Sequence, residues 1–184
     1  LEAVPPGGRF LFFGRLSPEK GLATLVQAAR TSGVALDLLG DGPQRAELEA
    51  LAAGADNIRF LGYRSGDALW DALRSCRAVV LPSEWYENAP MSVLEAYSFG
   101  KPVIGARIGG IPELVVENKT GWLFPSGDPV ALAQLLARVD KQPADEWPAI
   151  AQACNEFVSE RFSRKRYFET MASLFEHLIA TRTE

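Results

Sequence analysis

Residues 78–99 read AVVLPSEWYENAPMSVLEAYSF, and this stretch predicts a strand, a loop and a helix in succession. The apolar run at residues 78–81 is typical of a buried strand, which ends at Pro82. We expect a short helix over residues 91–99, with Pro90 suited to its first position.

Two acidic residues of this stretch are candidate ligand-binding groups. Glu87 lies in the loop that leaves the strand, and Glu95 lies about a turn and a half into the helix. Both can face the crevice at the carboxyl ends of the strands, where open α/β sheets bind ligands. A carboxylate that accepts hydrogen bonds from two ribose hydroxyls suits Glu95. The alternatives are exposed helix charges and, more weakly, a glycosidase acid–base pair, since such pairs flank a scissile bond.

The rest of the chain alternates short β-rich runs with helical patterns. Strands are expected at residues 10–13, 35–39, 58–61, 78–81, 102–106 and 122–124. Helices are expected near residues 21–31, 44–53, 67–74, 91–99, 129–140, 145–160 and 164–181. This alternation predicts an α/β fold: a Rossmann-like parallel sheet of about six strands with helices on both faces.

Bulk properties narrow the class of protein. The 184 residues suit a single domain spanning 1–184, and no apolar run approaches the length of a membrane span. A net charge of −4 argues against a nucleic-acid-binding module. Cys76 and Cys154 lack metal-ligand spacing and are expected to be unpaired thiols of a cytoplasmic protein. His177, the single histidine, is expected to be a surface or packing residue, and the start at Leu1 is typical of a fragment.

The sequence GRLSPEKG at residues 14–21 follows the first strand and opens the first helix. Arg15 and Lys20 therefore bring two positive charges to a helix N-terminus, which itself favours anions. Bidentate arginine and point-charge lysine together suit a diphosphate. The alternative is a solvated pair on a surface loop.

Two glycine-rich stretches and an aromatic pair are weaker indications of a ligand-binding site. Gly109 and Gly110 permit close approach to a ligand, or form a tight turn before a short helix at Pro112. The sequence GDGP at residues 40–43 fits a nicotinamide dinucleotide fingerprint poorly, since Arg45 stands where glycine is needed. Trp70, Trp122 and Trp147 are expected in the core, whereas Trp85 and Tyr86 beside Glu87 could stack on a ligand.

In combination, these motifs resemble the C-terminal, donor-binding half of glycosyltransferase family 4 (group 1), retaining enzymes with the GT-B fold. The resemblance runs in order from about residue 10 to residue 139. It is carried by FGRLSPEKG at 13–21, LGDGP at 39–43, FLG at 60–62, LPS at 81–83, the stretch from Glu87 to Glu95, GKPVI at 100–104, GGIPE at 109–113 and TGWLF at 120–124.

The resemblance implies roles for individual residues. Arg15 and Lys20, with Gly14 beside them, would grip the diphosphate of a nucleotide sugar and stabilise the charge that develops as it departs. Glu95 would bind the ribose, and Glu87 would contact the donor sugar near the reacting carbon. The remaining implied contacts are backbone at Tyr63 and Arg64 near the base, and amides at Ala89, Met91 and Ser92 near the sugar or phosphate. Pro90 departs from the family pattern because it has no N–H where many members have glycine.

The resemblance also implies a function for the whole protein. It would be a retaining, hexosyltransferase-like enzyme of polysaccharide or glycoconjugate biosynthesis that needs no metal or other cofactor. An N-terminal domain outside this chain would bind the acceptor. Any association of the full-length protein with the periphery of the inner membrane would occur through that domain. The fragment alone would be inactive. The helix within residues 164–184 would pack toward that domain, leaving apolar positions exposed: Tyr167, Phe168, Met171, Leu174, Phe175, Leu178 and Ile179. The alternatives are a non-catalytic nucleotide-binding or scaffold module, and a sugar-nucleotide epimerase of GT-B shape.

Overall fold

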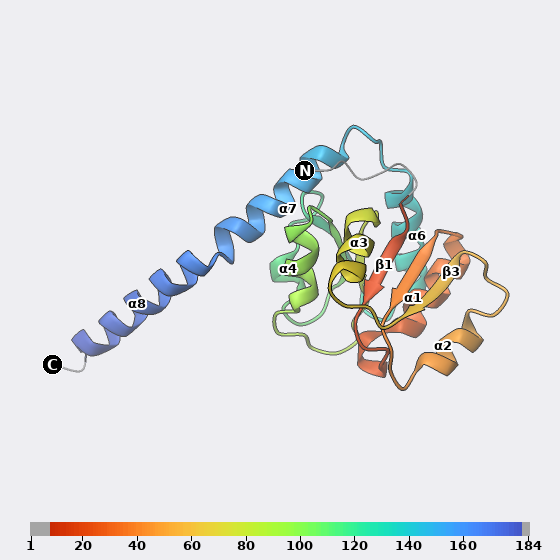
Figure 1. Ribbon diagram of the computed structural model, residues 1–184, viewed down its shortest axis with the longest axis horizontal. Coiled ribbons are helices and arrows are strands. Elements are labelled where there is room, and N and C mark those ends of the chain that lie inside the picture. The colour runs from red at the N-terminus through yellow and green to blue at the C-terminus, as the bar shows by residue number, and fades with distance from the viewer. Residues whose placement is uncertain (1–7, 182–184) are drawn as a thin grey trace.

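The computed structural model describes residues 8–181, which fold around a six-stranded sheet (Figure 1). Every pair of neighbouring strands is parallel, and the strand order is β3-β2-β1-β4-β5-β6. The strands are β1 (Phe10–Phe13), β2 (Leu36–Leu39), β3 (Ile58–Gly62), β4 (Val79–Leu81), β5 (Val103–Ala106) and β6 (Gly121–Phe124). This sheet confirms the expected Rossmann-like α/β class.

Helices cover both faces of the sheet. The structure contains α1 (Leu22–Ser32), α2 (Arg45–Leu51), α3 (Asp67–Ser75), α4 (Met91–Ser98), α5 (Ile111–Leu114), α6 (Pro129–Asp140), α7 (Trp147–Arg161) and α8 (Arg164–Thr181), with a short 3-10 helix η1 (Pro18–Lys20) before α1. Helix α1 packs against α2 and α6, and α4 packs against α7. Figure 1 shows these two groups on opposite sides of the strands.

Several helix ends differ slightly from the sequence-based expectation. Pro90 is the N-cap of α4 rather than its first residue, because its ψ of 118° is extended and the helical turns begin at Met91. Helix α7 begins at Trp147 rather than at residue 145, with Pro148 in its first turn, where a missing N–H costs nothing. Helix α8 ends at Thr181, and residues 182–184 of the expected terminal helix lie outside the described residues.

The strand order places a crevice between β1 and β4. The chain runs outward from β1 to β2 and β3, then returns to β4 on the other side of β1. Connections that leave the carboxyl ends of β1 and β4 therefore diverge to opposite faces, which opens a ligand-binding crevice at this point. The loops that follow these two strands carry Arg15, Lys20 and Glu87.

The core lies between the sheet and its covering helices, and the strands read as nearly continuous apolar runs because both faces are covered. Phe10 and Phe12 of β1, Val80 of β4 and Ile104 of β5 are almost completely buried. Tyr97 of α4 is also fully buried, and its hydroxyl satisfies its hydrogen-bonding capacity with the carbonyl of Leu114 and the hydroxyl of Thr120.

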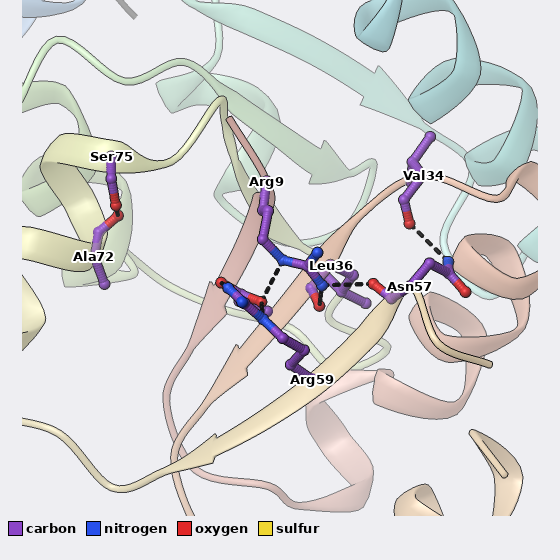
Figure 2. A network of polar contacts seen from close by, with 8 residues as sticks. Arg9, Val34, Leu36, Asn57, Arg59, Ala72 and Ser75 are labelled. Atoms are coloured by element: carbon purple, nitrogen blue, oxygen red, sulfur yellow. Dashed lines mark hydrogen bonds and ion pairs between the residues drawn. The ribbon is translucent and has the colours of Figure 1, made fainter. Parts of the chain in front are cut away.

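A charged network interrupts this apolar pattern away from the crevice, near the start of β1. Asp37 of β2 accepts a hydrogen bond of 2.6 Å from Arg9 and bonds of 2.8 and 2.7 Å from Arg59. Figure 2 shows Arg9 also reaching the carbonyls of Leu36 and Asn57. Burial alone would raise the pKa of Asp37, but the two guanidinium groups outweigh it and hold that pKa below its ordinary value. The network ties the start of β1 to β2 and β3.

Helix α8 extends away from the rest of the molecule as an arm (Figure 1). As expected from the sequence, its large apolar side chains are exposed, with Met171 partly so. The exposed members are Tyr167, Phe168, Leu174, Phe175, Leu178 and Ile179. A monomeric protein seldom presents so many apolar groups on one element, so this helix has the character of a contact surface.

Candidate functional site: a two-part crevice at the carboxyl ends of β1 and β4

The loop after β1 is held in place by direct contact with the loop after β2. The N–H of Gly14 donates to the carbonyl of Leu39, and the N–H of Leu16 donates to the carbonyl of Asp41. At Gly40 the backbone approaches so closely that a Cβ there would lie 1.8 Å from the oxygen of Gly14. The GDGP motif therefore serves close packing between two loops, which only glycine allows.

Arg15 lies where two cavities meet. A cavity of about 460 Å³ and another of about 450 Å³ share Phe13, Gly14 and Arg15 in their walls. Within residues 8–181, the guanidinium of Arg15 has no hydrogen-bonding or ion-pair partner, and the residue is exposed; only its backbone carbonyl is bonded, by the N–H of Ser17. An unpaired guanidinium between two cavities is placed to bind an anion that spans both of them.

In the smaller cavity, the structure brings together two residues far apart in sequence. The ammonium of Lys20 lies 2.5 Å from a carboxylate oxygen of Glu87, and the same oxygen accepts a 3.1 Å hydrogen bond from the hydroxyl of Ser83. Both side chains keep access to solvent, with relative exposures of 26% for Lys20 and 20% for Glu87. No role of its own was expected for Ser83 from the sequence, although its place in the LPS motif, two residues after β4, was a usable signal.

The start of α4 lines the same cavity from the opposite wall. Ala89, Met91 and Ser92 all contribute to it, together with Glu95 one turn further along. The first N–H groups of a helix have no intrahelical partner and favour negative charge. Burial raises the pKa of Glu95, and no cation contributes to that shift. Glu95 is thus a partly desolvated carboxylate that forms no ion pair within residues 8–181 and suits neutral hydrogen-bond donors.

The larger cavity contains the residues that were expected to face a nucleobase. Tyr63 and Arg64, directly after β3, line it together with Asp41 and Trp70. Trp70 packs against the core, as expected, and stacks on Phe99, but it is only partly buried because it also forms part of the cavity wall. Asp41 was noted within the GDGP motif without being assigned to a site. Apolar and aromatic walls with a few polar groups are typical of small-molecule sites.

The second glycine pair supports the loop that carries Glu87. The N–H of Gly110 donates a 2.7 Å hydrogen bond to the carbonyl of Glu87. A Cβ on Gly109 would lie 2.5 Å from that carbonyl oxygen, and one on Gly110 would lie 2.0 Å from the carbonyl oxygen of Asn88. The expected turn before α5 is present, and the close backbone approach that the two glycines allow is to the loop of Glu87 and Asn88. It lines neither of the two cavities.

Trp85 and Tyr86 are well exposed, with 68% and 79% of their surfaces accessible. They do not line either cavity, so the expectation that they could stack on a bound ligand stays a prediction. Trp122 and Trp147 are buried, as expected.

The remaining candidates lie apart from the crevice. His177 lies on the exposed arm of α8. Cys76 and Cys154 are buried free thiols, and burial raises the pKa of each to about 12, as expected of unreactive cysteines. Among residues 8–181, no helix is long and apolar enough to cross a bilayer. In the same part of the chain, no three metal-ligating side chains gather into a candidate metal site.

This fold and crevice define a Rossmann-like domain whose crevice has an unpaired arginine, an ion-paired lysine and the start of a helix on one side and an aromatic cavity on the other. The particular family follows from comparison with known proteins. Residues 5–166 match the family described as glycosyl transferases group 1, and the chain belongs to that family.

Similar proteins agree with this assignment. The amylovoran biosynthesis glycosyltransferase AmsK of Erwinia amylovora is 31% identical, over 92% of this chain and 45% of its own length. The crystal structure of Anabaena Alr3699/HepE in complex with UDP-glucose superposes with a TM-score of 0.77 at 26% identity, over 91% of this chain and 49% of that one. The C-terminal domain of the Francisella tularensis group 1 protein LpcC shares the fold, with a TM-score of 0.74 at 23% identity, over 88% and 89% of the two chains. This chain spans about half the length of the first two relatives.

Proposed function

We propose that this chain is the donor-binding half of a retaining glycosyltransferase of family 4, which transfers a hexose from a nucleoside diphosphate sugar to an acceptor hydroxyl. The observation that carries the proposal is the crevice in which Arg15, Lys20, Glu87 and Glu95 converge beside the start of α4. The relative Alr3699/HepE, which binds UDP-glucose, supports the same class of donor.

The donor fits the two-part crevice in one orientation. The base lies in the larger cavity against Tyr63 and Arg64, because the aromatic and apolar walls are there. The ribose hydroxyls donate to Glu95, which has no protein counter-charge. The diphosphate lies between Arg15 and the N–H groups at the start of α4, and the sugar reaches toward Glu87. This arrangement follows the order of groups along the ligand.

Catalysis in this proposal comes from electrostatic stabilisation of the departing diphosphate. Negative charge grows on the leaving group as the bond to the sugar breaks, and fixed cations and helix-end dipoles lower the energy of that transition state. Arg15, Lys20 and the amides of Met91 and Ser92 supply these groups, so no metal or other cofactor is required. Pro90 has no N–H, so the amide contacts come from Ala89 on one side of it and from Met91 and Ser92 on the other.

The acceptor site belongs to the proposed N-terminal half, which is also the partner we infer for the exposed face of α8. Its proximity to the donor is needed for transfer, since the reaction depends on holding both reactants in one geometry. The 184-residue chain alone is accordingly inactive in transfer. A cytoplasmic location, with membrane association through the other half, remains part of the proposal and is testable by fractionating cells that express the full-length protein.

Calorimetric titration of the full-length protein with UDP, GDP and ADP, in the presence of a metal chelator, tests the proposal. We expect saturable binding of at least one of them without added metal. A transfer assay with the matching sugar nucleotide, using the full-length protein and the 184-residue chain side by side, tests the catalytic part. Absence of binding by all three at millimolar ligand, or robust transfer by the 184-residue chain, would contradict the proposal.

A further inference from the structure

The smaller cavity carries less net positive charge than a diphosphate site would be expected to have. Its walls include two cations, Arg15 and Lys20, and two carboxylates, Glu87 and Glu95. Glu95 is accounted for by the proposed ribose contact. Glu87 instead lies 2.5 Å from the Lys20 ammonium and so neutralises one of the two cations that would hold the diphosphate.

The Lys20–Glu87 pair is held in place from several sides. Ser83 donates to the carboxylate oxygen that faces Lys20, and the Glu87 backbone carbonyl accepts the N–H of Gly110. The lysine is the last residue of η1, which is linked to the same loop by the hydrogen bond from the Glu84 N–H to the Glu19 carbonyl. A phosphate that approaches Lys20 must therefore compete with a fixed carboxylate.

The donor and the spent nucleotide differ at the end that faces this pair. The terminal phosphate of a free nucleoside diphosphate loses a second proton with a pKa of about 6. At neutral pH it therefore carries roughly one negative charge more than the sugar ester, whose corresponding oxygen is bonded to the sugar. The sugar also brings hydroxyl groups that can donate hydrogen bonds to a carboxylate, which the bare phosphate cannot do.

We propose that Glu87 makes the site selective for the intact sugar nucleotide over the nucleoside diphosphate that remains after transfer. The carboxylate repels the extra charge of the spent nucleotide and withholds Lys20 from it, whereas donor hydroxyls satisfy the same carboxylate. This inference rests on the proposed function and adds a role for Glu87 in rejecting product. In this proposal, the Lys20–Glu87 ion pair assists release of the nucleoside diphosphate after transfer.

The test compares two ligands on one variant. For whichever nucleoside diphosphate binds the wild-type full-length protein, calorimetry at about pH 7.5 gives its Kd and that of its glucose ester. The variant Glu87→Gln removes the charge but keeps the shape of the side chain. We expect it to bind the nucleoside diphosphate roughly two- to fivefold more tightly, the range for release of a partly exposed ion pair, and the glucose ester no more tightly than wild type.

The matched control is Glu84→Gln in the same loop. The Glu84 carboxylate accepts from Thr24 and lies outside both cavities, so the ratio of the two Kd values should stay at its wild-type value. A second comparison measures the Kd for the nucleoside diphosphate in the Lys20→Gln variant with and without Glu87→Gln. The gain in affinity from Glu87→Gln should be smaller there than in the wild-type background, because no lysine is left to release.

The outcomes separate this inference from the function on which it rests. If the wild-type protein binds neither ligand, the proposed function fails and the selectivity role fails with it. If both ligands bind but Glu87→Gln leaves the ratio of their Kd values unchanged, or increases the preference for the glucose ester over the nucleoside diphosphate, the selectivity role alone is overturned. A ratio that shifts equally in Glu84→Gln would also overturn it, since the effect would then reflect general charge.

Discussion

Replacing Gly40 by alanine should disrupt the crevice at its base. Gly40 has a φ of 143°, in a region that residues with a Cβ rarely adopt, and this strain costs about 1–3 kcal/mol. The new Cβ would also lie 1.8 Å from the Gly14 oxygen, whereas real Cβ contacts essentially never fall below 3.0 Å. The two loops must therefore separate by more than 1 Å.

That separation breaks backbone hydrogen bonds as well. The bond from Gly14 to Leu39 and the bond from Gly40 to Gly62 both lie at the contact, and each contributes about 0.5–1.5 kcal/mol. Strain and lost bonds together give an expected loss of about 2–6 kcal/mol in the free energy of unfolding. This is a large share of the roughly 5–15 kcal/mol that stabilises a typical domain.

Urea denaturation followed by circular dichroism measures this loss, and calorimetry with a nucleoside diphosphate measures the effect on the site. Gly33→Ala is the matched control, because Gly33 also has a positive φ of 73° but no atom lies within 4 Å of a Cβ built there. Its expected cost is the backbone strain alone, about 1–2 kcal/mol. Because Arg15 follows Gly14, the Gly40 variant should also lose most of its nucleotide affinity, whereas the Gly33 variant should keep it. Equal stability losses in the two variants, or unchanged nucleotide affinity in Gly40→Ala, would refute the argument that loop contact positions Arg15.

Four further predictions follow from the site and the sheet. Arg15→Ala should weaken nucleoside diphosphate binding by about 1.5–3 kcal/mol in calorimetry, the range for hydrogen bonds to charged groups, and Lys20→Ala by less, because Lys20 is already paired with a carboxylate. Glu95→Gln should raise the melting temperature of the ligand-free protein at pH 7. The pKa of Glu95 is raised in the fold, so keeping this carboxyl ionised at a pH well above its ordinary pKa of 4.5 costs stability. The gain in melting temperature should therefore narrow as the pH falls toward 4.5. The same variant should lose affinity for the ribonucleotide but little for the 2′,3′-dideoxy analogue, and equal losses would remove Glu95 from the ribose site. Asp37→Ala should lower the free energy of unfolding by about 1–3 kcal/mol at pH 7 in urea denaturation, because it leaves the partly buried guanidinium of Arg9 without its carboxylate acceptor and removes the ion pair with the exposed Arg59. Since the pKa of Asp37 is lowered in the fold, the wild-type advantage should disappear as the pH falls through that pKa, and a difference that persists in acid would contradict the ionic origin. Deleting residues 164–181 should leave the melting temperature of the 184-residue chain nearly unchanged, because the large apolar side chains of α8 are exposed, and a marked drop would mean that the helix packs on the domain.

The sequence alone determined the order and type of the elements around the sheet. Apolar runs of four or five residues, each followed by a helical pattern, leave few arrangements other than a parallel sheet covered on both faces. The general rule that ligands bind at the carboxyl ends of the strands then places Arg15, Lys20, Glu87 and Glu95 near one crevice. These predictions succeeded because they depend on local periodicity and on a general property of such sheets.

Only the tertiary structure decided how these side chains combine. Lys20 and Glu87 are separated by 67 positions, and nothing local indicates that they form an ion pair at 2.5 Å or that Ser83 supports it. Likewise, Asp37 interrupts an apolar strand for a reason visible only when β1 and β3 bring Arg9 and Arg59 beside it. Contacts between distant segments depend on strand register and loop packing, which the order of residues along the chain does not encode locally.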